Sequence, residues 1–342
     1  MAKYVLKRIL LMILTFFVIV TICFMLIRLL PRELPMEENL REVMLARFEA
    51  LGYNEPLLVQ YGIYLKNIFT SWDFGTSWYV QFRADAWDVL MDRLWPTVLV
   101  NFYSFLLSVP LGLALGIYAA VRKNKWQDHL ISTLVMVFVS VPSYVYGFLV
   151  QYFLYFKLDL FPLTVSSLAD AGGSWFTWPM FYSMIPPIIA LSFGQIAGLC
   201  RFTRAELTET LTSDYMLLAR TKGLTRSQAT TRHALKNALI PVITIVGGMF
   251  GASLGGSLIT EVIFSIPGMG QYIMTGLNNR DYPVIQSGIL ILSTLFSLII
   301  LVVDVLYALV DPRIRSQYGR KKSRKRGHND EGKETKKEIP AA

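Results

Sequence analysis

Charged side chains are scarce in this sequence. Asp, Glu, Lys and Arg together make up 17% of its 342 residues, whereas an ordinary soluble domain contains about a quarter. Hydrophobic residues make up 54% of the chain. This balance argues against a soluble domain and favours a protein that lies largely within a membrane.

Residues that commonly perform chemistry are also few. The chain has three histidines and two cysteines, and the histidines fall in separate segments. Cys23 and Cys200 are expected in opposite halves of the membrane, which excludes a disulfide between them. Their spacing does not resemble a metal site.

Common catalytic motifs are absent from the sequence. It contains no Gly-x-Ser-x-Gly, no His-Glu-x-x-His and no Gly-x-x-x-x-Gly-Lys-Ser/Thr phosphate loop. We therefore predict that the chain is not an enzyme, holds no metal or cofactor, and does not hydrolyse ATP through such a loop.

Long apolar stretches are what the sequence does contain. A hydrocarbon core about 30 Å thick needs roughly 20 apolar residues in a helix. Six stretches reach or approach that length: residues 9–30, 97–121, 130–156, 185–203, 238–260 and 285–309. The sequence predicts an all-α, polytopic membrane protein with six transmembrane helices.

Positive charge is distributed unevenly between the connections. Basic residues gather before the first stretch, after the second, in the connection 201–241 and after the sixth. The connections between the third and fourth and between the fifth and sixth stretches hold Lys157 and Arg280. This alternation follows the positive-inside rule and places both termini in the cytoplasm. The net charge of +9 therefore reports topology, and we expect no nucleic-acid partner.

Four regions follow from this topology. Residues 1–30 form the first transmembrane helix, and residues 31–96 form an external cap with two short helices and interfacial tryptophans. Residues 97–312 form a five-helix core. Residues 313–342 are predicted to be a disordered, basic cytoplasmic tail that contacts anionic membrane lipid.

The fifth stretch carries glycines at intervals of four: Gly247, Gly251 and Gly255. Small residues at this spacing form a flat face that allows another helix to approach closely. Two interpretations stay open. The face packs against a helix of the same chain, or it lines a central pathway or contacts a helix of a partner subunit.

Three ionisable residues fall within or near the ends of the stretches. Asp304, near the inner end of the sixth, is expected to pair with or cap a cytoplasmic group. Arg28 and Glu261 are expected to reach the outer membrane surface. A chain of carboxylates at mid-membrane is missing, which argues against a proton-coupled carrier.

The connection 201–241 contains a short helix in its middle. Ser213 or Asp214 can cap this helix. The residues predicted to share one stripe on it are Tyr215, Leu218, Ala219 and Lys222.

A glycine turn and a second helix follow. Gly223 stands where a helix ends in a left-handed turn, and Thr225 with Gln228 forms a capping box for a helix that leads to Pro241. An exposed short helix is unstable alone. We expect it to insert into a groove on a partner and to act as a lever on the fifth stretch; the alternative is a helix that lies on the lipid surface.

Several segments along the chain form a larger pattern. They are Tyr4-Val5-Leu6-Lys7-Arg8-Ile9-Leu10, Glu55-Pro56-Leu57-Leu58-Val59-Gln60-Tyr61, Asp73-Phe74-Gly75-Thr76-Ser77, Ser140-Val141-Pro142-Ser143, Ala219-Arg220-Thr221-Lys222-Gly223-Leu224, Phe264-Ser265-Ile266-Pro267-Gly268-Met269-Gly270 and Asp311-Pro312-Arg313-Ile314-Arg315. In this order they resemble the dipeptide/oligopeptide permease family of ABC importers. Arg32-Glu33-Leu34 and the Ser/Gly-rich segment 166–182 depart from the family pattern.

The resemblance implies a transmembrane channel subunit of an ATP-driven, binding-protein-dependent importer of peptides in the bacterial cell membrane. It implies three kinds of partner: a homologous second permease, two ATP-binding subunits that hold the ATP, and an extracytoplasmic peptide-binding protein. The residues implied in coupling to the ATPase are Ser213, Asp214, Tyr215, Leu218, Ala219, Lys222 and Gly223.

Other functions stay open at this point. Related permeases carry nickel, glutathione or oligosaccharides, and the chain need not encode the choice of substrate. A stand-alone channel or secondary carrier is the alternative from a different class.

Overall fold

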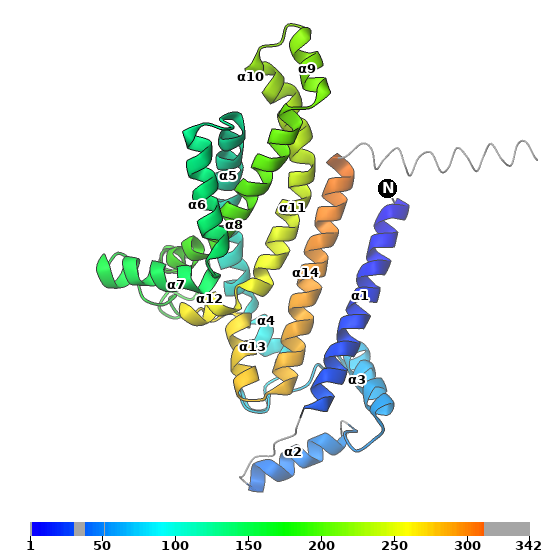
Figure 1. The fold of residues 1–342 in the computed structure, drawn as a ribbon. Helices are drawn as coiled ribbons and strands as arrows, with labels where there is room; N and C mark the ends of the chain where they lie inside the picture. Colours follow the sequence, from blue (N-terminus) through cyan, green and yellow to red (C-terminus); the bar gives the residue numbers. More distant parts are fainter. Residues whose placement is uncertain (1, 31–37, 51, 311–342) are drawn as a thin grey trace, which may run out of the picture.

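The computed structural model describes residues 2–30, 38–50 and 52–310 (Figure 1). Over these ranges the chain is helical, and the extended pairing is limited to an isolated bridge between Thr76 and Asp85. The all-α prediction is confirmed. The predicted tail, 313–342, lies outside the described residues.

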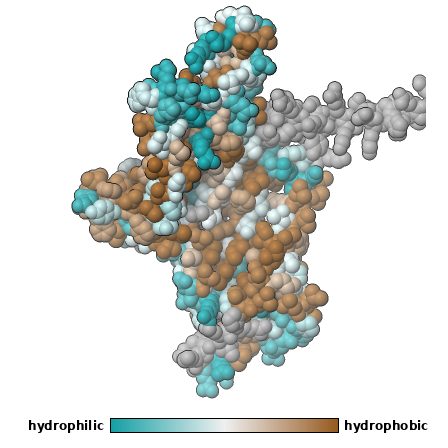
Figure 2. Space-filling view, in the orientation of Figure 1, coloured by the Kyte–Doolittle hydropathy of each residue, from teal (hydrophilic) through white to brown (hydrophobic). Residues whose placement is uncertain are grey.

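Five helices in the described part of the chain are long and apolar enough to cross a membrane. They are α1 (Ala2–Leu29), α5 (Leu94–Val121), α8 (Trp178–Leu211), α11 (Leu235–Gly256) and α14 (Tyr282–Val310). A helix of 28 residues, such as α1, is about 42 Å long at 1.5 Å per residue, which exceeds the hydrocarbon core. Hydrophobic residues cover the middle of the molecule (Figure 2), as contact with lipid requires.

The third predicted span, 130–156, is bent. Helix α6 (Trp126–Ser140) and the segment formed by α7 (Ser143–Gln151) and the π-helical turn η1 (Tyr152–Lys157) meet at 99°. The break has a local cause, because a proline disfavours helical backbone in the residue before it. Here Pro142 follows Val141, which is extended at φ −84° and ψ 129°. The count of six spans holds when this bent pair is taken as one, and α7 projects sideways from the other helices (Figure 1).

Helices α5 and α8 pack closely against each other in the core. A Cβ added to Gly116 of α5 would lie 2.7 Å from Cβ of Thr203, and one on Gly112 would lie 3.0 Å from Cβ of Leu199. Distances this short leave no room for a side chain. Glycine on α5 therefore permits the close approach of α8.

The external cap consists of α2 (Glu38–Ala50), α3 (Leu57–Ser71) and α4 (Ala86–Met91). Its loop is tied to the start of α14 by the buried carboxylate of Asp281. Oδ2 of Asp281 accepts from Ser77 Oγ at 2.6 Å. The same oxygen accepts from the backbone N–H groups of Trp78, Tyr79 and Val80.

The two ends of the molecule differ in what they present. The start of α1, the end of α14 and the loop between α8 and α11 lie at one end (Figure 1). The cap lies toward the other end, where α4 contacts α13 (Met269–Asn278), and α12 (Leu258–Ile263) lies between the two ends. This arrangement agrees with the predicted topology, in which both termini share a side with the connection 201–241.

Candidate coupling loop

The loop between α8 and α11 begins with the short helix α9 (Asp214–Thr221). Ser213 precedes it with extended backbone at φ −75° and ψ 155°. Its hydroxyl does not cap α9; instead Oγ donates to the carbonyl of Thr210 at 2.6 Å. Ser213 therefore ties the end of α8 to the start of α9, so the two helices change direction at a braced corner.

A glycine turn ends α9. Gly223 has φ +88°, in the left-handed region that side-chain-bearing residues rarely adopt. Its N–H donates to the carbonyl of Arg220 at 3.0 Å, and the N–H of Leu224 donates to the carbonyl of Ala219 at 3.4 Å. This pair of bonds is the Schellman arrangement, and it satisfies carbonyls that the helix end would otherwise leave free.

The second helix starts with the predicted capping box. Thr225 Oγ1 accepts from the N–H of Gln228 at 3.3 Å, and Gln228 Oε1 accepts from the N–H of Thr225 at 3.1 Å. This prediction is confirmed. Helix α10 (Arg226–Ala229) passes into the π-helical turn η2 (Thr230–Ala234) and then into α11 without a break. A displacement of the turn is therefore carried along the backbone into a membrane helix.

The two faces of α9 have different environments. Met216 and Ala219 are buried, at 4% and 7% exposed, against a cluster from α8, α10, η2 and α11. Tyr215, Leu217 and Leu218 are exposed, at 40%, 64% and 56%. Ala219 was expected on one stripe with Tyr215 and Leu218, and the structure turns it inward instead. Leu217 was not among the predicted residues.

The exposed face of α9 is therefore apolar at the tip of a polar loop. Lys222 and Asp214 are exposed beside it, and hydrophobic residues lie among hydrophilic ones at this end of the molecule (Figure 2). An apolar patch with a charged rim is typical of a protein interface.

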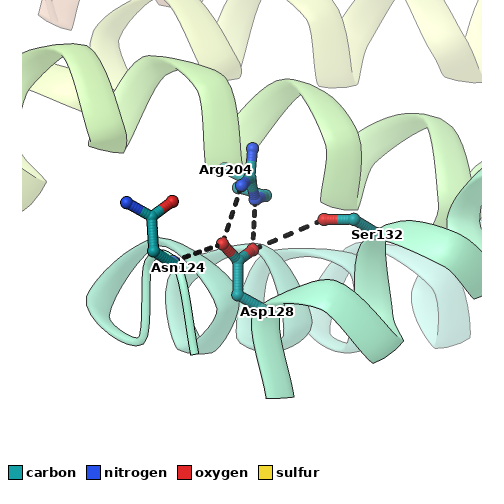
Figure 3. Close-up of polar contacts among 4 residues, drawn as sticks. All are labelled: Asn124, Asp128, Ser132 and Arg204. Carbon is teal, nitrogen blue, oxygen red and sulfur yellow. Dashed lines mark hydrogen bonds and ion pairs between the residues drawn. The ribbon is translucent and has the colours of Figure 1, made fainter. Parts of the chain in front are cut away.

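A buried ion pair braces α8 below the loop. Asp128, 1% exposed in the first turn of α6, accepts from Arg204 of α8 at 2.5 Å (Nε to Oδ1) and 2.8 Å (Nη2 to Oδ2) (Figure 3). The backbone N–H of Asn124 and the hydroxyl of Ser132 also donate to this carboxylate, at 2.9 Å and 3.4 Å. Two parallel bonds fix orientation as well as distance.

The sequence analysis missed this pair. The two residues are 76 positions apart, and each lies next to an apolar stretch rather than within one. A charged residue at the edge of an otherwise uncharged helix was the available signal. The pair joins α6 to the helix that carries the loop, so a movement of α8 acts on α6 as well.

The glycines of α11 divide between two environments. A Cβ on Gly247 would lie 2.8 Å from Cβ of Val303, and one on Gly251 would lie 2.7 Å from the ring of Phe296, both on α14. These two glycines permit close packing of α11 on α14 within the chain. A Cβ on Gly255 would meet nothing within 4 Å.

Adjacent glycines on α11 give a matched pair of tests. Gly247→Ala is expected to destabilise the protein by about 1–3 kcal/mol, because overpacking forces Val303 and its helix apart. Gly248→Ala is the control, since a Cβ there meets nothing within 4 Å and alanine favours a helix over glycine. Thermal unfolding of the detergent-purified protein measures both, and equal melting temperatures would contradict the packing.

Asp304 has the cytoplasmic partner that the sequence predicted. Arg8 of α1 donates to it at 3.0 Å, so the pair links the first and last transmembrane helices. This ion pair lies at one end of a groove of about 450 Å³ between α1, α11 and α14.

Two predictions of surface contact need correction. Arg28 does not extend away from the protein; its guanidinium lies over the rings of Tyr53 and Phe24, 3.4 Å and 4.8 Å from their centroids. Glu261 is 1% exposed in α12, beyond the end of the membrane-spanning part of α11.

Within the described residues, no group of three or more His, Cys, Asp or Glu side chains could hold a metal ion. The polar contacts named above tie helices together. Long apolar helices and a protruding loop with an apolar tip define a multi-pass membrane protein.

Comparison with known protein families shows which family the chain belongs to. The chain belongs to the family of binding-protein-dependent transport system inner membrane components, whose model matches residues 112–316. The N-terminal model for membrane components of the same transport systems matches residues 1–101. The chain is thus a multi-pass protein of the bacterial inner membrane, and it works with the other components of an ABC transport system.

Individual relatives cover nearly the whole chain. The dipeptide transport system permease protein DppB of Lactococcus lactis is 37% identical over 92% of this chain and 100% of the relative. DppB of Alkalihalophilus pseudofirmus is 36% identical over 92% and 100%. The glutathione transport system permease protein GsiC of Salmonella typhimurium is 35% identical over 92% of this chain and 99% of the relative.

Proposed function

We propose that this chain is the channel-forming subunit of an ATP-driven importer of peptides. The observation that carries the proposal is the similarity, over 92% of the chain, to permeases of dipeptide and glutathione transport systems. Glutathione is itself a tripeptide, so both groups of relatives point to small peptides. Nickel and oligosaccharides stay as alternatives that the binding protein would select.

The complete transporter contains a second, homologous permease, two ATP-binding subunits and an external peptide-binding protein. A partner permease is supported by membership of the family of inner membrane components of binding-protein-dependent transport systems. The ATP-binding subunits hold the nucleotide, and this chain transmits their movement.

Coupling takes place through α9. Its exposed residues Tyr215, Leu217 and Leu218 insert into a groove on an ATP-binding subunit. Gly223 supplies the turn that aims α9 outward while η2 and α11 continue into the membrane. The closed ATPase pair binds one arrangement of the loop more tightly than the open pair does. This difference in affinity shifts the channel between inward- and outward-facing states.

Truncation of the exposed face tests the docking. Leu218→Ala is expected to weaken the association with the ATP-binding subunit by about tenfold or more, which is 1.4 kcal/mol. The reason is that the groove on that subunit loses the apolar side chain that fills it. Leu158→Ala is the matched control, since Leu158 is also 56% exposed but follows η1 on the external side. Quantitative co-purification from membranes measures both. Equal recovery of the ATPase from the two variants would contradict the assignment.

The function as a whole is tested by reconstitution. The chain, purified with its partners and placed in liposomes, is expected to accumulate a labelled dipeptide only when ATP and the binding protein are both supplied. Uptake by the single chain without ATP would support a stand-alone carrier and refute the importer.

A further inference from the structure

The carboxylate of Glu261 is buried where several elements meet. Oε1 accepts from Thr97 Oγ1 at 2.8 Å and from Ser257 Oγ at 3.3 Å. Oε2 accepts from the backbone N–H of Gln271 at 3.0 Å. A carboxylate that is 1% exposed is costly unless donors surround it, and this one has donors on both oxygens.

The glycines of the segment 264–270 make room for this carboxylate. A Cβ on Gly268 would overlap Oε2 of Glu261, and one on Gly270 would lie 2.8 Å from it. Both glycines are buried at the start of α13. The two glycines are therefore explained by the space that Glu261 occupies, and they have no part in the coupling loop.

Thr97 completes the junction. Its Oγ1 donates to Glu261 and accepts from the N–H of Met269 at 2.9 Å. Thr97 belongs to α5, Ser257 joins α11 to α12, and Met269 begins α13. Glu261 thus binds three helices at the end of α11 that lies opposite the coupling loop (Figure 1).

We propose that Glu261 is a positioning residue for transport: it fixes the end of α11 that is far from the coupling loop to α5 and α13, so that α13 moves with α11. The proposal rests on the proposed function, in which the loop displaces the inner end of α11. Without this connection, α11 would still move at its cytoplasmic end, and α13 would no longer follow.

A role in stability alone makes a different prediction. Loss of a merely structural contact would lower the amount of folded protein and leave the peptide transported per ATP unchanged. Loss of the connection would lower that ratio in the protein that does fold. The ratio therefore separates the two roles even when a variant accumulates poorly.

The test uses the whole transporter in liposomes. Thr97→Val keeps the size of the side chain and removes the bridging hydroxyl, and Glu261→Gln keeps the shape and removes the charge. Each is expected to lower the peptide transported per ATP hydrolysed by about fivefold or more, the scale of a lost buried hydrogen bond. Thr97→Ser retains the hydroxyl and is expected to restore the wild-type ratio.

A second threonine of the core serves as control. Thr203 is 1% exposed, and its Oγ1 has no hydrogen-bond partner among the described residues, so Thr203→Val should leave the ratio unchanged. Wild-type ratios in both Thr97→Val and Glu261→Gln would overturn the proposal. A wild-type complex that hydrolyses ATP without importing any peptide would instead refute the proposed function, so the two failures are distinguishable.

Discussion

Replacement of Gly223 by proline is expected to abolish ATP-driven peptide uptake while the chain remains in the membrane. Proline holds φ near −65°, whereas the turn after α9 needs φ +88°. Proline also removes the N–H that donates to the carbonyl of Arg220. The turn must then rebuild in another direction, and α9 can no longer present its exposed face to the ATPase.

Two milder substitutions at the same position serve as controls. Gly223→Asn is expected to retain most uptake, because asparagine enters the left-handed region more easily than other residues. Gly223→Ala should be intermediate, since the left-handed conformation costs an alanine about 1–2 kcal/mol. Uptake is measured per unit of chain in the membrane. Full uptake by Gly223→Pro would show that the direction of the turn is unimportant.

Asp128→Asn is expected to reduce uptake by more than tenfold and to destabilise the chain. Removal of one partner from a buried ion pair costs about 3–5 kcal/mol. The side chain of Arg204 is 32% exposed, so water partly solvates the charge left behind and the lower end of that range, about 3 kcal/mol, applies. The measurement is uptake together with thermal unfolding of the purified protein.

A double-mutant cycle separates the pair from its single residues. Arg204→Gln alone should cost a similar amount, because it leaves the buried Asp128 without its guanidinium. In the Asp128→Asn background the same change should cost far less, since no charge remains uncompensated. Additive losses would mean that the two side chains act independently and that α6 and α8 are not joined by this contact.

Local signals predicted the coupling loop well. The glycine turn and the capping box of Thr225 and Gln228 are made within a few residues, so the sequence contains all the groups involved. The bend at Pro142 was equally local and could have been predicted, because the proline follows Val141 directly. Its effect was missed because the apolar composition continues unbroken across it.

Contacts between distant segments could not be predicted in this way. Both faces of α9 carry apolar side chains at helical spacing, and only the packing of α8 and α11 decides that Met216 and Ala219 face inward. Glu261 was predicted to lie at the membrane surface. Its burial depends on donors from α5 and α13, which the residues around Glu261 in the sequence do not reveal. The pairing of Asp128 with Arg204 likewise depends on the arrangement of two helices in space.

The central claim is that the exposed face of α9 contacts an ATP-binding subunit. A photo-reactive amino acid placed at Leu218 in the assembled transporter tests this contact most directly, with the same probe at Leu158 as control. The account predicts a cross-link from position 218 to the ATP-binding subunit that changes in yield when ATP is added, and none to that subunit from position 158. Cross-links from position 218 to lipid alone would contradict it and would place α9 on the membrane surface.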